Sequence, residues 1–238
     1  MNIAVVLAAG NGKRFLGENR NVPKQFFEIF RKEVIAYSLE TFSKNANIDE
    51  IVVVTNLEYI KKVQEIIKKY DIKKIKGVVA GGVTRQASVY SALHYLRTFY
   101  TATDNNIIIH DAARLLVTDK EINDVLDGLK THYAVTVALP LVDTCVESED
   151  GVFMGKNVDR SKIYRIQTPQ GFKFDTLVKA HKIAQGLGDN EFTDDCSLMR
   201  LINEPVYLVK GKSTNLKLTT GDDLVIIKGI LEERGYNK

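Results

Sequence analysis

The sequence predicts an α/β fold, in which a mostly parallel sheet is flanked by helices in a Rossmann-like manner. Short apolar runs rich in β-branched residues alternate with segments of helical periodicity along most of the chain, which is typical of βαβ units. One polar segment interrupts this alternation. We therefore expect one domain, residues 1–238, with a protruding β-arm at about residues 141–166.

The expected elements follow this alternation in order. The strands are short runs of mostly apolar residues, at 3–7, 51–55, 77–80, 106–110, 134–140 and 206–209. The helices have the 3.6-residue apolar period and are expected at 34–44, 57–70, 88–97, 120–131, 173–187, 194–202 and 222–234. Thr220 and Asp223 have the spacing of an N-cap and its partner three residues on, which predicts the start of the last helix.

The polar segment is expected to form a hairpin arm. Residues 142–147 alternate apolar and polar side chains, and Glu149, Asp150 and Gly151 then give a turn signature. The segment has too few apolar residues to form a core of its own, so an arm fits better than a second domain.

Composition limits the partners and the compartment. The net charge is only +3, with 45% hydrophobic and 26% charged residues, and the basic residues are dispersed, so we expect no nucleic-acid partner. Apolar runs stay well below the ~18 residues of a membrane span, and Met1 leads directly into the first strand, so we expect neither a membrane segment nor a signal peptide. Cys145 and Cys196 form no CxxC pair, which favours reduced thiols and a cytoplasmic protein.

The loop after the first strand consists of small residues: Ala8, Ala9, Gly10, Asn11 and Gly12. At the carboxyl end of a parallel strand, such residues let backbone N–H groups approach a phosphate. The loop lacks the third glycine of a dinucleotide fingerprint and the Lys-Ser/Thr ending of a Walker A motif. Arg14 and Lys24 follow it and could both reach one phosphate, although they could equally be surface charges beside a simple glycine turn.

These segments resemble the 2-C-methyl-D-erythritol 4-phosphate cytidylyltransferases and their relatives, the ribitol-5-phosphate cytidylyltransferases. Seven segments match in order across nearly the whole chain. They are residues 7–14 with Pro23-Lys24-Gln25, residues 81–89 (GGVTRQASV), residues 110–114 (HDAAR), residues 159–161 (DRS), residues 167–170 (QTPQ), residues 193–195 (TDD) and residues 215–219 (NLKLT). The resemblance implies a nucleotidyltransferase fold.

The resemblance implies transfer of CMP from CTP to 2-C-methyl-D-erythritol 4-phosphate, with release of pyrophosphate. The attacking phosphate oxygen is already ionised, so catalysis depends on positioning and on cationic stabilisation of the α-phosphate. The implied catalytic residues are Arg14, Lys24, Arg160 and Lys217. Of these, Arg14 and Lys24 would stabilise the transition state, and Arg160 and Lys217 would hold the acceptor phosphate.

The implied nucleotide site combines the first loop with the second glycine segment. Close backbone contact at Gly81 and Gly82 would exclude purines, and Ser88 would add a hydroxyl, although Ser88 could also simply begin a helix. The implied nucleotide-binding residues are Leu7, Ala8, Ala9, Gly10, Asn11, Gly12, Gly81, Gly82, Arg85, Ser88 and Ala112.

Asp111 is the implied metal ligand. It follows an expected strand at the end where α/β proteins bind ligands, and a single carboxylate can help hold Mg²⁺, the expected cofactor. A helix cap or an ion pair with Arg114 is the structural alternative. We expect His110 to be satisfied locally and not to bind metal, because no second His or Cys has ligand spacing.

The implied acceptor site draws on distant segments and on the arm. Its residues are Asp111, Arg114, Thr144, Arg160, Thr168 and Lys217. Because Thr144 and Arg160 lie on the arm, the resemblance implies a homodimer in which each arm enters the partner's site.

Three alternatives remain. Leu115 departs from the family pattern, which commonly has proline there. The loop between Arg14 and Lys24 is longer than in many methylerythritol enzymes and closer to that of the ribitol-5-phosphate enzymes, so CDP-ribitol synthesis is the second enzyme hypothesis. Ala113 and the segment at 159–161 favour the methylerythritol acceptor instead. A non-catalytic nucleotide-binding module is another class, and a nicotinamide oxidoreductase is disfavoured because residues 55–57 offer no acidic ribose ligand.

Overall fold

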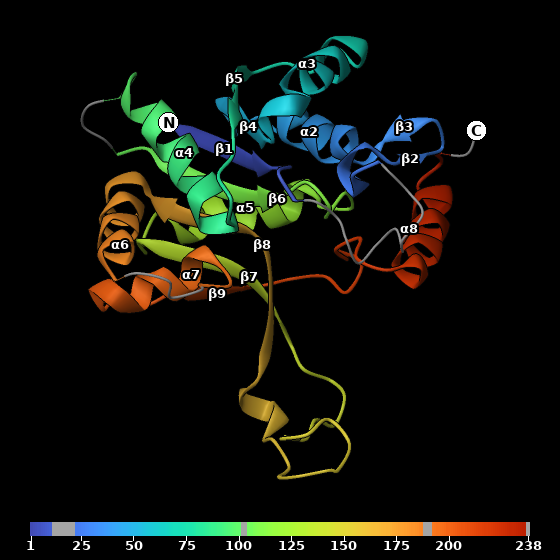
Figure 1. Ribbon diagram of the computed structural model, residues 1–238, viewed down its shortest axis with the longest axis vertical. Helices are drawn as coiled ribbons and strands as arrows, with labels where there is room; N and C mark the ends of the chain where they lie inside the picture. Colours follow the sequence, from blue (N-terminus) through green and yellow to red (C-terminus); the bar gives the residue numbers. More distant parts are fainter. Residues whose placement is uncertain (11–21, 101–103, 188–191, 237–238) are drawn as a thin grey trace.

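Seven strands form the central sheet of the protein, in the order β5-β4-β1-β6-β8-β7-β9 (Figure 1). The computed structural model describes residues 1–10, 22–100, 104–187 and 192–236. The strands are β1 (Asn2–Leu7), β4 (Glu50–Thr55), β5 (Ile75–Ala80), β6 (Asn106–Asp111), β7 (Ala134–Pro140), β8 (Tyr164–Lys173) and β9 (Tyr207–Lys210). Only the pairings of β8, with β6 and with β7, are antiparallel in this sheet. The predicted α/β fold with a mostly parallel sheet is therefore confirmed.

Helices cover both faces of the sheet, as the alternation of buried side chains in β1 requires. Ile3 and Val5 join one core cluster, and Ala4 and Val6 join the other. The first face packs against α4 (Arg85–Arg97), α6 (Phe174–Gly186) and α7 (Asp195–Leu198); the second packs against α2 (Val34–Lys44), α3 (Ile60–Lys69) and α5 (Asp119–Gly128). Burial on both faces explains why these strands read as continuous apolar runs.

A small satellite core joins the C-terminal helix to a hairpin. The hairpin consists of β2 (Glu28–Ile29) and β3 (Lys32–Glu33), and Ile227 and Leu231 of α8 (Gly221–Glu233) pack beside it. Thr220 begins α8 with the predicted capping box, because its hydroxyl accepts from the Asp223 amide and the Asp223 carboxylate accepts from the Thr220 amide. This core places the segment before α8 beside the loop after β6.

The sequence did not predict β8, and this is the main correction to the expected elements. Pro169 lies inside the strand, and proline cannot donate a ladder hydrogen bond, so it argues against a central strand. The pairing with β7 shifts register between Thr136 and Ala138, opposite residues 166–170 of β8, which include Pro169. Residues 164–166, which we had assigned to the arm, belong to β8.

The arm therefore spans residues 141–163 and projects away from the sheet (Figure 1). Its two sides are joined by one isolated bridge, Val146 with Asn157, and by a few scattered backbone hydrogen bonds, such as that from the Leu141 amide to the Ile163 carbonyl at 2.9 Å, so the predicted alternation does not become a regular strand. The predicted turn is present: Gly151 has φ +72°, and the Asp150 carboxylate accepts from the amides of Val152 and Phe153 at 2.8 and 2.9 Å.

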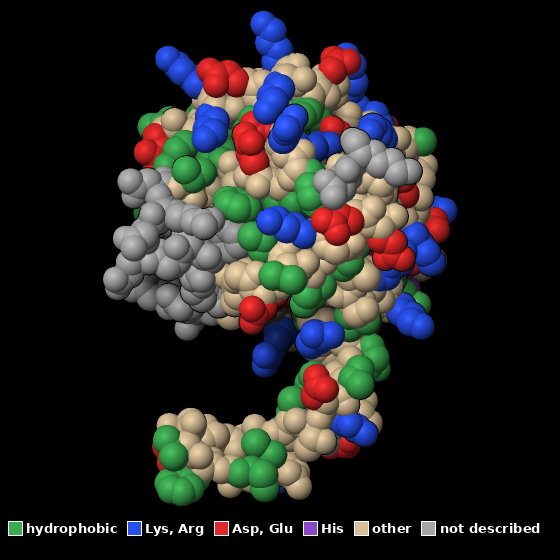
Figure 2. All heavy atoms as spheres, turned by 90° about the vertical axis from the view of Figure 1, so that its right-hand side faces the viewer, with side chains coloured by type: hydrophobic (Ala, Val, Ile, Leu, Met, Phe, Trp, Pro, Cys, Tyr) green, Lys and Arg blue, Asp and Glu red, His purple; other side chains and the backbone are tan. Residues whose placement is uncertain are grey.

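The surface of the body carries Lys and Arg side chains interspersed with Asp and Glu (Figure 2). Apolar side chains on the arm are largely exposed, among them Val142, Val152, Phe153 and Met154. None of the helices that the structure describes is long and apolar enough to cross a membrane.

Candidate active site

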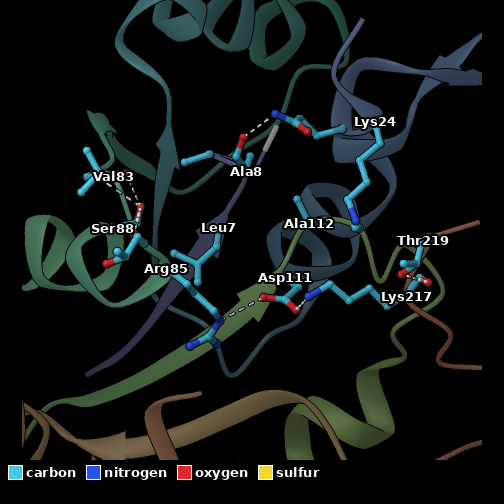
Figure 3. A pocket seen from close by; sticks show the side chains of 16 residues that line it. Leu7, Ala8, Lys24, Val83, Arg85, Ser88, Asp111, Ala112, Lys217 and Thr219 are labelled. Carbon is cyan, nitrogen blue, oxygen red and sulfur yellow. Dashed lines mark hydrogen bonds and ion pairs between the residues drawn. The ribbon is translucent and has the colours of Figure 1, made fainter. Parts of the chain in front are cut away.

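A cleft of about 360 Å³ opens at the carboxyl ends of β1 and β6 (Figure 3), where parallel strands of α/β proteins present their ligand sites. It brings together eleven of the predicted residues: Leu7, Ala8, Ala9, Gly10, Lys24, Gly82, Arg85, Ser88, Asp111, Ala112 and Lys217. They come from five separate parts of the chain, so the fold assembles what the sequence keeps apart.

The absence of side chains at two glycines allows close packing here, of Gly81 against the first loop and of Gly82 against α4. A Cβ on Gly81 would lie 2.8 Å from both Ala9 Cβ and Ser88 Oγ, and one on Gly82 would lie 2.4 Å from Ala87 Cβ. Ser88 Oγ accepts from the Gly82 amide at 3.2 Å and donates within the same turn of chain, to the Thr84 carbonyl at 2.9 Å. Backbone polar groups and one hydroxyl therefore form this wall of the cleft.

Asp111 lies between two cations in the cleft (Figure 3). Its Oδ2 is 2.7 Å from Lys217 Nζ, and its Oδ1 is 3.6 Å from Arg85 Nε. Burial acts to raise the pKa of Asp111, but the charges of Lys217 and Arg85 outweigh it and hold that pKa well below its usual range. The carboxylate is therefore ionised at neutral pH.

Arg85 links the cleft to a buried carboxylate behind it. Its Nη1 forms an ion pair with Asp195, which is 1% exposed and also accepts from His181 Nε2 at 3.0 Å. Burial acts to lower the pKa of Arg85, but the charges of Asp195 and Asp111 outweigh it and raise that pKa. Arg85 is held from both sides by carboxylates at the inner edge of the cleft.

Lys24 enters the cleft from the opposite side. It begins a 3₁₀ turn, Lys24–Phe26, and its Nζ donates to the Leu218 carbonyl at 2.8 Å. The adjacent Gln25 is 2% exposed, and its side-chain Nε2 donates to the Ala8 carbonyl at 2.6 Å. This bond fixes the turn against the first loop, so Lys24 and Lys217 both face the space around Asp111 and Ala112 (Figure 3).

A buried hydrogen-bond chain positions Asp111. His110 Nε2 lies 3.1 Å from the Arg114 carbonyl, and its Nδ1 lies 3.0 Å from Thr168 Oγ1. A carbonyl only accepts, so Nε2 carries the proton and Nδ1 accepts from the Thr168 hydroxyl. Thr168 in turn accepts from the Asp111 amide at 3.1 Å. His110 is thus satisfied locally, as predicted, and burial lowers its pKa to about 4.

Five predicted residues do not line the cleft. Gly81 lies just behind it. Thr168 is 5% exposed and acts on the backbone of Asp111. Arg114 donates to the carbonyls of Asn215 and Ile166, at 2.8 and 3.5 Å, in place of the predicted ion-pair alternative. Thr144 and Arg160 lie on the arm, where Arg160 Nη1 donates to the Val142 carbonyl at 2.6 Å. Asn11, Gly12 and Arg14 lie outside the described residues.

The cleft also contains residues to which the sequence assigned no role: Gln25, Val83, Thr84, Ala113 and Thr219. Thr84 could have been recognised as an N-cap, because it is a threonine directly before a helical pattern. In the structure its hydroxyl accepts from the Ala87 amide at 3.0 Å. Asp195 lies in the matched segment 193–195, but nothing in the sequence indicated its ion pair with Arg85. The neighbouring carboxylate, Asp194, is the N-cap of α7, and only the tertiary fold reveals that the two carboxylates have different roles.

The cleft has the parts for binding a nucleoside triphosphate. Lys24 and Lys217 supply positive charge, the first loop supplies small residues for close approach, and the glycine wall offers backbone groups to a base. Asp111 fits a magnesium ion as one carboxylate ligand, because its Oδ1 has only the longer, 3.6 Å contact with Arg85. Within the described residues no group of three or more His, Cys, Asp or Glu side chains could hold a metal, so phosphate oxygens and water would complete the coordination.

The chain is similar to proteins of known activity along nearly its whole length. A family model described as 2-C-methyl-D-erythritol 4-phosphate cytidylyltransferase matches residues 2–233. The ribitol-5-phosphate cytidylyltransferase of Vibrio parahaemolyticus is 38% identical over 237 residues, covering 98% of this chain and 96% of that protein. The 2-C-methyl-D-erythritol 4-phosphate cytidylyltransferase of Clostridium acetobutylicum is 37% identical over 235 residues, covering 98% of both.

Solved structures agree. The 4-diphosphocytidyl-2C-methyl-D-erythritol synthase of Anaerococcus prevotii superposes with a TM-score of 0.80 at 25% identity, covering 97% of this chain and 98% of that one. The 2-C-methyl-D-erythritol 4-phosphate cytidylyltransferase of Thermus thermophilus gives 0.76 at 28% identity, covering 98% and 100%. The chain belongs to the 2-C-methyl-D-erythritol 4-phosphate cytidylyltransferase family and is an enzyme, a cytidylyltransferase that uses CTP.

Proposed function

We propose that the enzyme transfers CMP from CTP to 2-C-methyl-D-erythritol 4-phosphate and releases pyrophosphate. One observation carries the proposal: Lys24, Lys217 and Asp111 lie in one cleft, whose opposite wall is formed by Gly82 and Ser88. Lys24 and Lys217 supply the positive charge that binding of a triphosphate requires, and in the proposed complex Gly82 and Ser88 would contact the base. The family model that matches the chain supports the same acceptor.

In this mechanism an oxygen of the acceptor phosphate attacks the α-phosphorus of CTP in line with the departing pyrophosphate. Negative charge gathers on the α-phosphate oxygens, and Lys24 stabilises it. Lys217, whose Nζ already bonds Asp111 at 2.7 Å, holds and aims the acceptor phosphate. The attacking oxygen is ionised at neutral pH, so no side chain needs to act as a base. Arg14 joins Lys24 in the proposal on the strength of the sequence alone.

Magnesium is the proposed cofactor. Asp111 would hold it together with oxygens of the triphosphate, and it would neutralise charge on the leaving pyrophosphate. Asp111 suits this role because Lys217 and Arg85 keep it ionised.

Ribitol 5-phosphate is the second candidate acceptor, because a relative that makes CDP-ribitol is as similar in sequence as the methylerythritol enzymes. Leu115, which departs from the family pattern, does not favour either acceptor. Its side chain is 2% exposed and packs in the satellite core with Ile29 and Leu218, away from the cleft. The preference for the methylerythritol acceptor rests on the matching family model, on Ala113 and on the segment at 159–161.

The arm supports a proposed homodimer. Its exposed apolar side chains need a cover, and an arm of this size is marginal in water by itself. Arg160 and Thr144 lie outside the cleft of their own chain, so in the proposed dimer they would complete the partner's acceptor site.

Two free cysteines, Cys145 and Cys196, support a cytoplasmic location.

The proposal is tested by identifying the product. The enzyme is incubated with CTP, Mg²⁺ and 2-C-methyl-D-erythritol 4-phosphate and followed by phosphorus NMR. We expect free pyrophosphate and a new pair of coupled diphosphate signals. Signals of CTP that stay unchanged, or that decay to CMP or CDP without an acceptor-linked product, would refute the proposed reaction.

A further inference from the structure

Lys217 is carried by a segment without helix or strand, residues 211–219, between β9 and α8. Its Nζ must nevertheless stay within reach of Asp111 and of an acceptor. A long side chain on an irregular segment is placed only as well as its backbone is held. Near Lys217 this backbone is held on both sides: the Leu218 amide donates to the Ala113 carbonyl at 2.9 Å, and Asn215, two positions before Lys217, is 0% exposed and bonds to neighbouring elements.

Asn215 bonds in two directions. Its Nδ2 donates to the Thr168 carbonyl of β8 at 2.9 Å and to Glu121 Oε1 of α5 at 2.9 Å. Its own carbonyl accepts from Arg114 Nη1 at 2.8 Å and from Gln167 Nε2 at 3.2 Å. The segment is thereby tied to the strand whose Thr168 hydroxyl also holds the Asp111 amide. Both members of the Lys217–Asp111 pair are anchored through Thr168.

Glu121 is a buried carboxylate that the proposed mechanism does not use. It is 1% exposed and lies in the first turn of α5, outside the cleft. Its Oε2 accepts from the amide and the hydroxyl of Thr118, at 3.1 and 2.9 Å, and its Oε1 accepts from Asn215. All three contacts are donors, so both oxygens must be acceptors. An ordinary capping box needs only the Thr118 side of this arrangement.

We propose that Glu121 and Asn215 are positioning residues for Lys217. Glu121 orients the Asn215 amide, Asn215 fixes the height of the segment above β8, and this sets where Lys217 Nζ lies relative to Asp111. The inference rests on the proposed function for the role of Lys217 toward the acceptor phosphate. It adds that α5, a helix on the far side of that segment, controls the acceptor side of the cleft.

Glu121→Gln tests the proposal with almost no change of shape. A glutamine offers one oxygen and one NH₂ group where the structure requires acceptors on both sides. With its oxygen toward the two Thr118 donors, its NH₂ opposes the Asn215 amide and the link breaks. We expect kcat/KM for the acceptor to fall on the order of 10–100-fold, as a misplacement of about 1 Å does, with KM for CTP changed by less than about twofold.

A double-mutant cycle separates positioning from general damage. In a Lys217→Ala background, Glu121→Gln should cause no further loss, because the residue it positions is gone. Thr118→Ala is the matched control: it weakens the cap of the same helix but leaves the Glu121–Asn215 bond, so the melting temperature should fall while acceptor kcat/KM stays at the wild-type value.

An equal loss from Glu121→Gln in both backgrounds, wild-type kinetics for that variant, or an equal kinetic loss from Thr118→Ala would each overturn the inference. If Glu121→Gln does not fold, Asn215→Ala removes the other partner of the Glu121–Asn215 bond and is tested in the same double-mutant cycle with Lys217→Ala. Absence of wild-type turnover with both acceptors would refute the proposed function instead. The positioning pair is then tested by the ¹⁵N NMR signal of the Lys217 ammonium group, whose Nζ lies 2.7 Å from Asp111: it should shift in Glu121→Gln and not in Thr118→Ala, and an unchanged signal in Glu121→Gln would overturn the inference.

Discussion

Lys24 reaches the cleft from a 3₁₀ turn whose position depends on its neighbour. Gln25 bonds the Ala8 carbonyl at 2.6 Å, and Lys24 Nζ bonds the Leu218 carbonyl at 2.8 Å, so the ammonium group is directed across the cleft before substrate binds. Preorganised cations of this kind stabilise a transition state without reorganising during the reaction.

Lys24→Ala should therefore lower kcat by on the order of 10²–10³, the usual cost of one such donor. Lys61→Ala, on the exposed side of α3, is the control and should leave kcat unchanged. Steady-state pyrophosphate release and a melting curve check both variants. Near-normal turnover of Lys24→Ala would remove Lys24 from the mechanism.

His110 gives the fold a defined dependence on pH. Burial lowers its folded pKa to about 4 from an ordinary value of 6.5, so the unfolded chain binds more protons between these values. The contribution of neutral His110 to the free energy of unfolding is fully present above pH 6.5. It is lost as the pH falls to 4, by up to about 3 kcal/mol. Because the pKa of Asp111 is lowered in the folded state, the stability that this carboxylate contributes is lost only below about pH 4.

Urea unfolding at pH 7 and at pH 4.5 measures this difference. The free energy of unfolding of the wild type should fall between the two, and His110→Gln, which cannot titrate, should show a clearly smaller fall. The same fall in both proteins would show that another group is responsible.

At the scale of elements, the turn before α4 depends on the absence of two side chains. Gly81→Ala would place a methyl group 2.8 Å from Ala9 Cβ and from Ser88 Oγ, so the first loop and the base-facing wall must separate. We expect KM for CTP to rise by at least about tenfold, as for other small misplacements, with acceptor KM less affected.

Gly229→Ala is the matched glycine control. Gly229 is exposed inside α8 and a Cβ there would meet nothing within 4 Å, so the change should stabilise the protein by about 1 kcal/mol without altering KM. Titration of CTP by calorimetry compares the two variants. Unchanged CTP affinity in Gly81→Ala would contradict the assignment of this wall to the base.

The elements that the sequence predicted well are those with buried apolar faces. β1, β4, β6 and β7 were located to within a residue, because each is apolar and ends at a turn signal. β8 was missed because Pro169 and the polar residues around it are typical of loops. Its buried polar side chains, Thr168 and Gln170, form hydrogen bonds with partners distant in sequence, such as His110 and Asp194, which no local pattern reveals.

Across the whole molecule, some of the predicted site residues line the cleft and others lie away from it. Local motifs indicated the residues at the ends of β1 and β6, and the cleft contains them. The contacts of Arg114 and the anchoring of Arg85 by Asp195 could not be predicted, because they depend on how the segments after β8 return to the sheet. Arg160 and Thr144 remain predictions about a partner subunit.

Mixed dimers test the shared site. Arg160→Ala and Lys24→Ala subunits are each expected to be nearly inactive when pure. In a mixed dimer with shared sites, one site combines both lesions and the other has intact Lys24 and intact Arg160, so activity should return toward half of wild type. If each chain used its own Arg160, every site would carry one lesion. No recovery in mixed dimers that are shown to form would refute the shared site.

We expect this cleft to join CTP to a sugar-alcohol phosphate, with 2-C-methyl-D-erythritol 4-phosphate as the preferred acceptor. Pyrophosphate release is measured with CTP or ATP against 2-C-methyl-D-erythritol 4-phosphate, ribitol 5-phosphate and no acceptor. We predict release that requires both CTP and an acceptor, with the larger kcat/KM for 2-C-methyl-D-erythritol 4-phosphate. Comparable release from ATP, or release that does not depend on an acceptor, would contradict the account, and a larger kcat/KM for ribitol 5-phosphate would replace the proposed acceptor.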